Sequence, residues 1–244
     1  MSATSILQVE RLSKSFRGLQ AIADVSFAIA PGSITSIIGP NGAGKSTLFK
    51  LITGYLAPTA GMVRFKDHPI TGMATNRIAE LGIGRAFQIA RPFRDLSVRE
   101  NVRIGALFGK AGPRDVEATT RRGMELASLM PLADQPASAL TVGQLRHLEV
   151  ARAIATRADL LLADEPCAGL NPTETAAMID VLRQIRSSGV TVLLVEHDMP
   201  SVMEVSDRLL VLDAGTLIAD GPPHDVAKDP KVIAAYLGTP DASS

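Results

Sequence analysis

The chain has 244 residues, and its 25 Lys and Arg residues balance its 25 Asp and Glu residues, so its formal net charge is zero. This balance argues against a nucleic-acid-binding protein that acts through a basic face. A single cysteine excludes a disulfide framework and a Cys-rich zinc site, and a hydrophobic content of 46% predicts a folded chain with a sizeable core.

The first third of the chain is predicted to consist mainly of strands that lead into one helix. Short apolar or alternating segments bounded by turn residues are typical of strands. The expected strands are Ile6–Val9, Val25–Ile29, Ser33–Ile38 and Gly61–Lys66. Beyond Gly39 the pattern becomes helical, because Leu48, Leu51 and Ile52 recur at the spacing of one helix face.

The middle of the chain, from Arg91 to Arg157, changes to helical periodicity with Pro and Gly breaks. The expected helices are Asn101–Phe108, Val116–Leu129 and Leu145–Ala155. Because strands stop before this stretch and resume after it, we interpret it as an inserted helical subdomain.

The last third returns to alternating strands and helices. The expected strands are Leu160–Ala163, Val190–Val195, Arg208–Asp213 and Thr216–Ala219, and the expected helices are Thr173–Ser188, Pro200–Val205 and Val232–Leu237. Buried strands that alternate with helices predict a mostly parallel sheet covered on both faces. No apolar segment is long enough to cross a bilayer and no secretory signal is visible, so we expect the chain to fold in the cytosol.

A glycine-rich segment between a predicted strand and a predicted helix matches the phosphate-loop pattern G-x-x-x-x-G-K-[ST]. Its residues are Gly39, Pro40, Asn41, Gly42, Ala43, Gly44, Lys45, Ser46 and Thr47. Backbone N–H groups and the helix N-terminus favour phosphate oxygens here. We expect Lys45 to reach the β- and γ-phosphates and the Ser46 hydroxyl to bind Mg²⁺. A plain glycine-rich turn is the alternative.

Two acids close the apolar strand at Leu160–Ala163. Asp164 is placed to hold Mg²⁺ through water, and Glu165 is placed to polarise an attacking water. The alternative is a pair of solvated acids after a core strand, and the phosphate loop in the same chain favours the functional interpretation.

Three further segments give the chain its resemblance to ABC ATPases. Leu140–Gln144 resembles the LSGGQ signature of that family, upstream of the two acids. Gln88 lies where the family has its Q-loop, and His197 resembles the switch histidine that follows a strand. The motifs stand in the family's order and span nearly the whole chain. A satisfied strand-end histidine is the alternative for His197.

The resemblance implies a fold and further binding residues. It implies an α/β P-loop NTPase (RecA-like) core with an N-terminal antiparallel β subdomain, residues 1–90 and 158–244 forming the core and residues 91–157 the helical subdomain of a single ABC ATPase domain. It implies that Phe16 stacks on adenine, with a core phenylalanine as the alternative. It also implies that a partner subunit's γ-phosphate is bound by Thr141, Gly143 and Gln144, and that Gln88 contributes to the Mg²⁺ site.

Two positions depart from the family pattern. Val142 replaces a glycine of the signature, and Asn171 stands where the family often has Asp. The contact made by the signature loop and any charge-dependent role at Asn171 are therefore open.

Less specific segments resemble the ATP-binding subunit of branched-chain amino acid importers, the ATPase type usually encoded first. These are Gly84–Gln88, Phe93–Arg94, Leu96–Val102, Glu165–Pro172, Glu196–Met199 and Val232–Gly238. The resemblance implies two integral-membrane permease subunits, a second ATPase subunit in a heterodimer (or a homodimer in isolation), a solute-binding protein and a peripheral location at the cytoplasmic face of the inner membrane.

The same resemblance implies that Gln88–Arg99 contacts the membrane subunits, with a solvated loop as the alternative. Two other functions are open at this point. A non-transport ABC ATPase acting on nucleic acid or the ribosome usually carries two cassettes or long coiled coils, which this chain lacks. The other alternative, a P-loop kinase that acts on small molecules, does not explain the presence of Leu140–Gln144 or of the Asp164–Glu165 pair.

Overall fold

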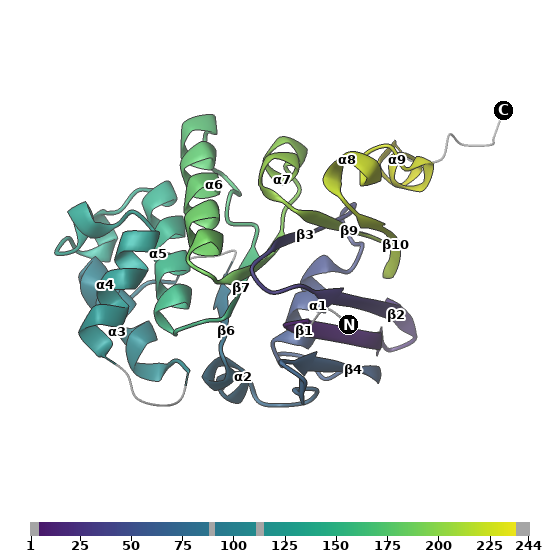
Figure 1. The fold of residues 1–244 in the computed structure, drawn as a ribbon, viewed down its shortest axis with the longest axis horizontal. Coiled ribbons are helices and arrows are strands. Elements are labelled where there is room, and N and C mark those ends of the chain that lie inside the picture. Colours follow the sequence, from purple (N-terminus) through teal and green to yellow (C-terminus); the bar gives the residue numbers. More distant parts are fainter. Residues whose placement is uncertain (1–4, 88–90, 111–114, 238–244) are drawn as a thin grey trace. The chain divides into compact units, whose positions relative to one another are not determined.

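A computed structural model describes residues 5–87, 91–110 and 115–237 of the chain (Figure 1). The chain divides into two compact units. The first contains Met1–Met73 and Leu194–Ser244, and the second contains Ala74–Leu193. No helix among the described residues combines the length and the apolar character that crossing a membrane requires.

An antiparallel sheet opens the first unit, with the strand order β2-β1-β4-β5. Its strands are β1 (Leu7–Phe16), β2 (Leu19–Ile29), β4 (Ala60–Phe65) and β5 (His68–Pro69). β1 and β2 form a hairpin closed by Arg17 and Gly18, which both have positive φ (43° and 92°). Such a two-residue turn suits the twist of a hairpin and requires left-handed residues. The N-terminal antiparallel sheet is thus confirmed, with strands longer than the sequence predicted.

A second group of strands in the first unit leads to the phosphate loop. β3 (Ile34–Ile38) is fully buried and pairs in parallel with β9 (Arg208–Asp213), which pairs antiparallel with β10 (Thr216–Gly221). The turn between β9 and β10 uses Ala214 and Gly215, both with positive φ, so the predicted hairpin is confirmed. The helices of this unit are α1 (Lys45–Ile52), α7 (Met199–Val205), α8 (Pro223–Val226) and α9 (Pro230–Leu237).

The second unit contains two parallel strands and the helices around them. β6 (Ile83–Ala86) pairs in parallel with β7 (Leu160–Asp164), with Ile83 opposite Leu160 and Ala86 opposite Ala163. α2 (Thr75–Leu81) precedes β6, and α6 (Pro172–Ser187) follows β7. β8 (Thr191–Val195) then carries the chain from the second unit into the first.

The helical part of the second unit lies between β6 and β7. Its helices are α3 (Val98–Phe108), α4 (Val116–Leu126) and α5 (Val142–Ala155), with short 3₁₀ turns at Met130–Leu132 and Ala137–Ala139. They share one apolar core, whose buried members run from Val98 to Ala155. The sequence placed the end of the second helix at Leu129. α4 ends earlier because Ser128 has a left-handed φ of 57°, which breaks the helix.

Candidate functional site

The glycine-rich segment connects the buried strand β3 to helix α1 in the first unit. A Cβ on Gly39 would lie 2.0 Å from the Leu212 carbonyl oxygen, and one on Gly44 would lie 2.7 Å from the Ala21 carbonyl oxygen. Both residues also have positive φ (148° and 102°). Only glycine fits these positions, because the backbone of the segment packs directly against the carbonyl groups of Leu212 and Ala21.

Lys45 is the first residue of α1, and its side chain folds back over the loop. The residue is 8% exposed, and its ammonium donates to the carbonyl oxygens of Gly39 (2.6 Å) and Pro40 (2.9 Å). Because Gly44 is the N-cap residue, no side chain caps the first turn of α1. The exposed N-terminal end of the helix, with a buried ammonium beside it, suits an anionic group such as a phosphate.

Phe16 ends strand β1 and is 41% exposed. This exposure contradicts the alternative of a core phenylalanine. The Lys14 ammonium lies 5.1 Å from the ring centroid and donates to the Ala57 carbonyl oxygen at 2.7 Å. The ring therefore offers an accessible flat surface for stacking, as predicted for an adenine.

His197 follows β8, and its side chain is 60% exposed. Its backbone N–H donates to the carboxylate of the buried Glu196 at 3.1 Å. The neighbouring Asp198 caps α7 by accepting from the backbone N–H and the hydroxyl of Ser201. These hydrogen bonds lower the pKa of Asp198. The turn around His197 is thus fixed while its imidazole remains accessible.

The paired acids lie in the second unit, at the end of β7. Asp164 is 6% exposed, and its carboxylate accepts from the Arg85 guanidinium at 3.0 Å. Glu165 has a left-handed φ of 50°, so the chain leaves the extended conformation directly after Asp164. The chain therefore turns at this end of the strand. The sequence analysis did not predict a role for Arg85, which it included only as a member of the segment Gly84–Gln88.

The signature segment begins helix α5 in the same unit. Thr141 is the N-cap residue, and its hydroxyl accepts from the Gln144 backbone while the Gln144 side chain accepts from the Thr141 backbone. A Cβ on Gly143 would lie 2.8 Å from a Glu174 carboxylate oxygen, so this glycine permits close packing on α6. Val142, which departs from the family pattern, is 58% exposed. Thr141 thus places a hydroxyl at the N-terminus of α5, which begins before the expected start at Leu145.

The predicted site residues are distributed over the two units. Phe16, the phosphate loop and His197 belong to the first unit, and Asp164, Glu165 and the signature segment belong to the second. Gln88, predicted for catalysis and for the Mg²⁺ site, lies outside the described residues.

The comparison with protein families decides the assignment. The family described as ABC transporter matches residues 22–168, which is more than half of the chain and includes the phosphate loop, the signature and both acids. This chain belongs to the ABC transporter family. Members of the family hydrolyse ATP to power transport, and the cassette described here is an ATPase that binds ATP.

Known relatives of this ABC cassette cover nearly all of it. The LivG protein of Escherichia coli (strain K12), a high-affinity branched-chain amino acid transport ATP-binding protein, is 39% identical over 96% of this chain and 98% of its own length. BraF of Pseudomonas aeruginosa shows the same identity and coverage. A further family, described as branched-chain amino acid ATP-binding cassette transporter, matches residues 216–242.

Solved structures confirm the fold class. The crystal structure of an ATP-binding cassette of an ABC transporter in its ADP conformation superposes with a TM-score of 0.86, at 32% identity, over 96% of this chain and 99% of the other. A nucleotide-free ATP-binding cassette gives a TM-score of 0.85 at 31% identity. The predicted α/β P-loop fold is therefore confirmed for this ABC cassette.

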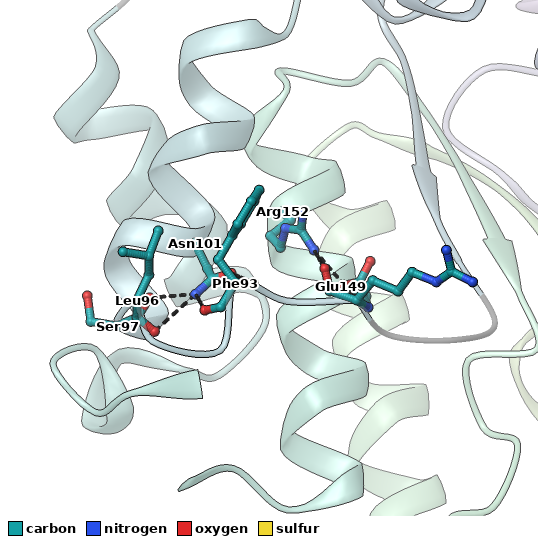
Figure 2. A network of polar contacts seen from close by, with 7 residues as sticks. Phe93, Leu96, Ser97, Asn101, Glu149 and Arg152 are labelled. Atoms are coloured by element: carbon teal, nitrogen blue, oxygen red, sulfur yellow. Dashed lines mark hydrogen bonds and ion pairs between the residues drawn. The ribbon is translucent and has the colours of Figure 1, made fainter. Parts of the chain in front are cut away.

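The ABC cassette holds the segment after residue 90 through two of its helices (Figure 2). On the α5 side, Glu149 is 5% exposed and accepts from the Arg91 backbone at 3.2 Å and from Arg152 at 2.6 Å. Arg152 also donates to the Arg91 carbonyl oxygen at 3.1 Å, and its guanidinium lies 5.7 Å from the Phe93 ring centroid. This part of the predicted docking segment is therefore ordered against α5.

On the α3 side, the fully buried Asn101 holds the same segment (Figure 2). Its side-chain oxygen accepts from the Phe93 backbone at 2.9 Å. Its amide nitrogen donates to the carbonyl oxygens of Phe93 (3.0 Å), Leu96 (3.2 Å) and Ser97 (2.9 Å). Phe93 itself remains 50% exposed, so the backbone is fixed while this aromatic side chain faces outward.

We expect Asn101→Ala to lower the free energy of unfolding by about 2–4 kcal/mol, because backbone groups around Phe93 and Ser97 lose a buried partner. Urea denaturation measures this loss. Arg103→Ala on the same helix is the control, since Arg103 forms an exposed ion pair with Glu117 and its loss should change stability by less than about 1 kcal/mol. An equally small loss of unfolding free energy in both variants would contradict the conclusion that Asn101 fixes the backbone around Phe93 and Ser97.

Proposed function

We propose that this chain is the ATP-binding and ATP-hydrolysing subunit of an ABC importer for branched-chain or other hydrophobic amino acids. The observation that carries the proposal is the match of residues 216–242 to the branched-chain amino acid cassette family. The 39% identity with LivG over 96% of the chain supports it. A role on nucleic acid or the ribosome is not favoured, because the relatives described above are named as transport ATP-binding proteins.

The chemistry assigns a role to each site residue. The Lys45 ammonium, which donates to two loop carbonyls here, transfers its hydrogen bonds to the β- and γ-phosphate oxygens of ATP. Phe16 stacks on the adenine. Glu165 accepts a proton from the attacking water, and His197 orients that water and the γ-phosphate. Thr141, Gly143 and Gln144 bind the γ-phosphate held by the partner subunit, so each active site is completed by two chains.

The residues also fit a Mg²⁺ ion. Magnesium prefers hard oxygen ligands and is usually held by one or two protein oxygens together with substrate phosphates. The Ser46 hydroxyl at the start of α1 is exposed, and Asp164 offers a carboxylate whose position is fixed by Arg85. When bound, the ion neutralises charge on the phosphates. Gln88 is proposed as a further ligand.

The partners follow from the same proposal. Two integral-membrane permease subunits, a second ATPase subunit and, indirectly, a solute-binding protein complete the importer, and the chain lies peripherally at the cytoplasmic face of the membrane. The segment Gln88–Arg99, of which the structure describes residues 91–99, contacts the permeases. Support comes from its fixed backbone and from the exposed Phe93 ring among arginine residues.

The division into a core (1–90 and 158–244) and a helical subdomain (91–157) is also part of the proposal. It is supported by the apolar core that the helices of the second unit share.

Uptake of radiolabelled leucine by cells tests the proposed function. We expect cells that lack this chain to lose high-affinity uptake, and cells that regain the wild-type chain or Lys50→Ala to recover it. Lys50 is exposed in the last turn of α1, so it controls for a charge lost from that helix. Undiminished uptake of leucine, isoleucine and valine without the chain would contradict amino-acid import.

A further inference from the structure

Arg85 lies on β6, directly beside the strand that ends in Asp164. In the register of the two strands, Arg85 is opposite Leu162 of β7. Asp164 follows two positions after Leu162, and side chains on a strand alternate between faces, so Arg85 and Asp164 lie on the same face of the sheet. The Arg85 guanidinium donates to Asp164 Oδ2 at 3.0 Å, and the two side chains are 11% and 8% exposed. A buried ion pair therefore joins the two neighbouring strands.

The same guanidinium also lies against an aromatic ring. Its central carbon is 4.7 Å from the centroid of the Phe87 ring. A guanidinium is attracted to the face of an aromatic ring and stacks on it. Phe87 is 40% exposed and immediately precedes Gln88 in the sequence. Arg85 thus contacts both the carboxylate at the end of β7 and the ring before Gln88, all within the second unit of the chain.

These two contacts limit how the Asp164 carboxylate can turn. The terminal torsion of an aspartate has a broad range when nothing holds the carboxylate. A planar guanidinium that is itself held by stacking offers its N–H donors in a fixed direction. The bond engages Oδ2, and a carboxylate has further lone pairs for a metal ion or a metal-bound water. The partners that orient a metal ligand typically contribute about 10- to 100-fold to metal affinity or activity.

We propose that Arg85 is a positioning residue of the Mg²⁺ site: stacked on Phe87, it fixes the Asp164 carboxylate and thereby increases the affinity of the chain for ATP with Mg²⁺. The inference rests on the proposed function, which assigns Asp164 to the Mg²⁺ ion, and it adds the two residues that hold this ligand in place. Arg85 acts through Asp164, so its loss should change the Mg²⁺-dependent part of nucleotide binding and leave the rest unchanged.

The substitution Arg85→Lys keeps the positive charge but removes the planar group, and it tests the proposal. We expect the dissociation constant for the non-hydrolysable ATP analogue AMP-PNP with Mg²⁺ to rise about tenfold. With EDTA in place of Mg²⁺, the variant should bind AMP-PNP like the wild type, because the phosphate loop belongs to the first unit. Arg77→Ala is the control, since Arg77 forms an exposed ion pair with Glu80 on α2. Equal affinity of Arg85→Lys and the wild type with Mg²⁺ would overturn the proposal.

Two substitutions of Phe87 test the stacking contact while the buried ion pair stays intact. Phe87→Leu removes the ring, and we expect the affinity for AMP-PNP with Mg²⁺ to fall about two- to fivefold, the range for loss of one cation–π contact. Phe87→Tyr keeps the ring and should bind like the wild type. Both variants should melt like the wild type without nucleotide, because Phe87 is partly exposed. Unchanged affinity in Phe87→Leu, or a fall of equal size with Mg²⁺ and with EDTA, would overturn the proposal.

Asp164→Asn separates a failure of the positioning role from a failure of the proposed function. We expect this variant to lose the gain in AMP-PNP affinity that Mg²⁺ gives the wild type. If Asp164→Asn keeps that gain, the assignment of Asp164 to the Mg²⁺ ion is wrong, and the proposal fails with it. If Asp164→Asn loses the gain while Arg85→Lys keeps it, the Mg²⁺ site stands and only the positioning role of Arg85 is overturned.

Discussion

Replacing Glu165 by Gln is expected to slow ATP hydrolysis by about two to four orders of magnitude, the usual contribution of a positioned base. The substitution keeps the size of the side chain but removes the carboxylate that would accept a proton from the attacking water. Glu165 has a left-handed φ and lies just beyond the buried Asp164, the last residue of β7. Exchanging its carboxylate for an amide therefore leaves β7 intact. ATP binding should be kept.

The release of phosphate by purified protein measures this effect, and size-exclusion chromatography with ATP detects the dimer that a non-hydrolysing variant should accumulate. Glu125→Gln is the control, since Glu125 pairs with Arg121 on the surface of α4. Near-normal turnover by Glu165→Gln would show that another group acts as the base.

Replacing Lys45 by Ala is expected to weaken ATP binding by about 10- to 100-fold, which corresponds to the loss of charge-assisted hydrogen bonds to the phosphates. The ammonium is buried and donates to the carbonyl oxygens of Gly39 and Pro40, so its removal takes a positive charge from the phosphate loop itself. The rate of ATP hydrolysis at cellular ATP concentrations should fall together with ATP binding.

Equilibrium titration with AMP-PNP and Mg²⁺ tests the prediction. Lys50→Ala, five residues further along α1 and exposed, should bind like the wild type. Equal affinity in Lys45→Ala and the wild type would contradict the assignment of the phosphate loop.

The features that the sequence predicted correctly depend on neighbouring residues. The apolar runs that became β3, β7 and β8, the Gly-rich loop before α1, and Thr141 at the start of α5 are all encoded within a few positions. Strand hydrophobicity, glycine conformation and helix capping act over that range, so a single sequence shows them.

The features that it missed depend on irregular backbone or on distant partners. β1 is longer than predicted because left-handed residues such as Arg11, together with shifts of register, let the pairing with β2 continue past the alternating segment. The contact of Arg85 with Asp164 joins residues 79 positions apart and has no local pattern. The buried Asn101 also shows its role only once its backbone partners are in place.

Reconstitution in lipid vesicles tests the central claim most directly, that this ATPase powers amino-acid import. The chain and its proposed partners (a second ATPase subunit, the permease subunits and a solute-binding protein) would be assembled together. ATP hydrolysis and leucine uptake would be measured in the same vesicles. We expect uptake to require ATP on the side of this chain, and we expect Glu165→Gln to abolish uptake and hydrolysis together. Leucine uptake that continues without hydrolysis by this chain would contradict it.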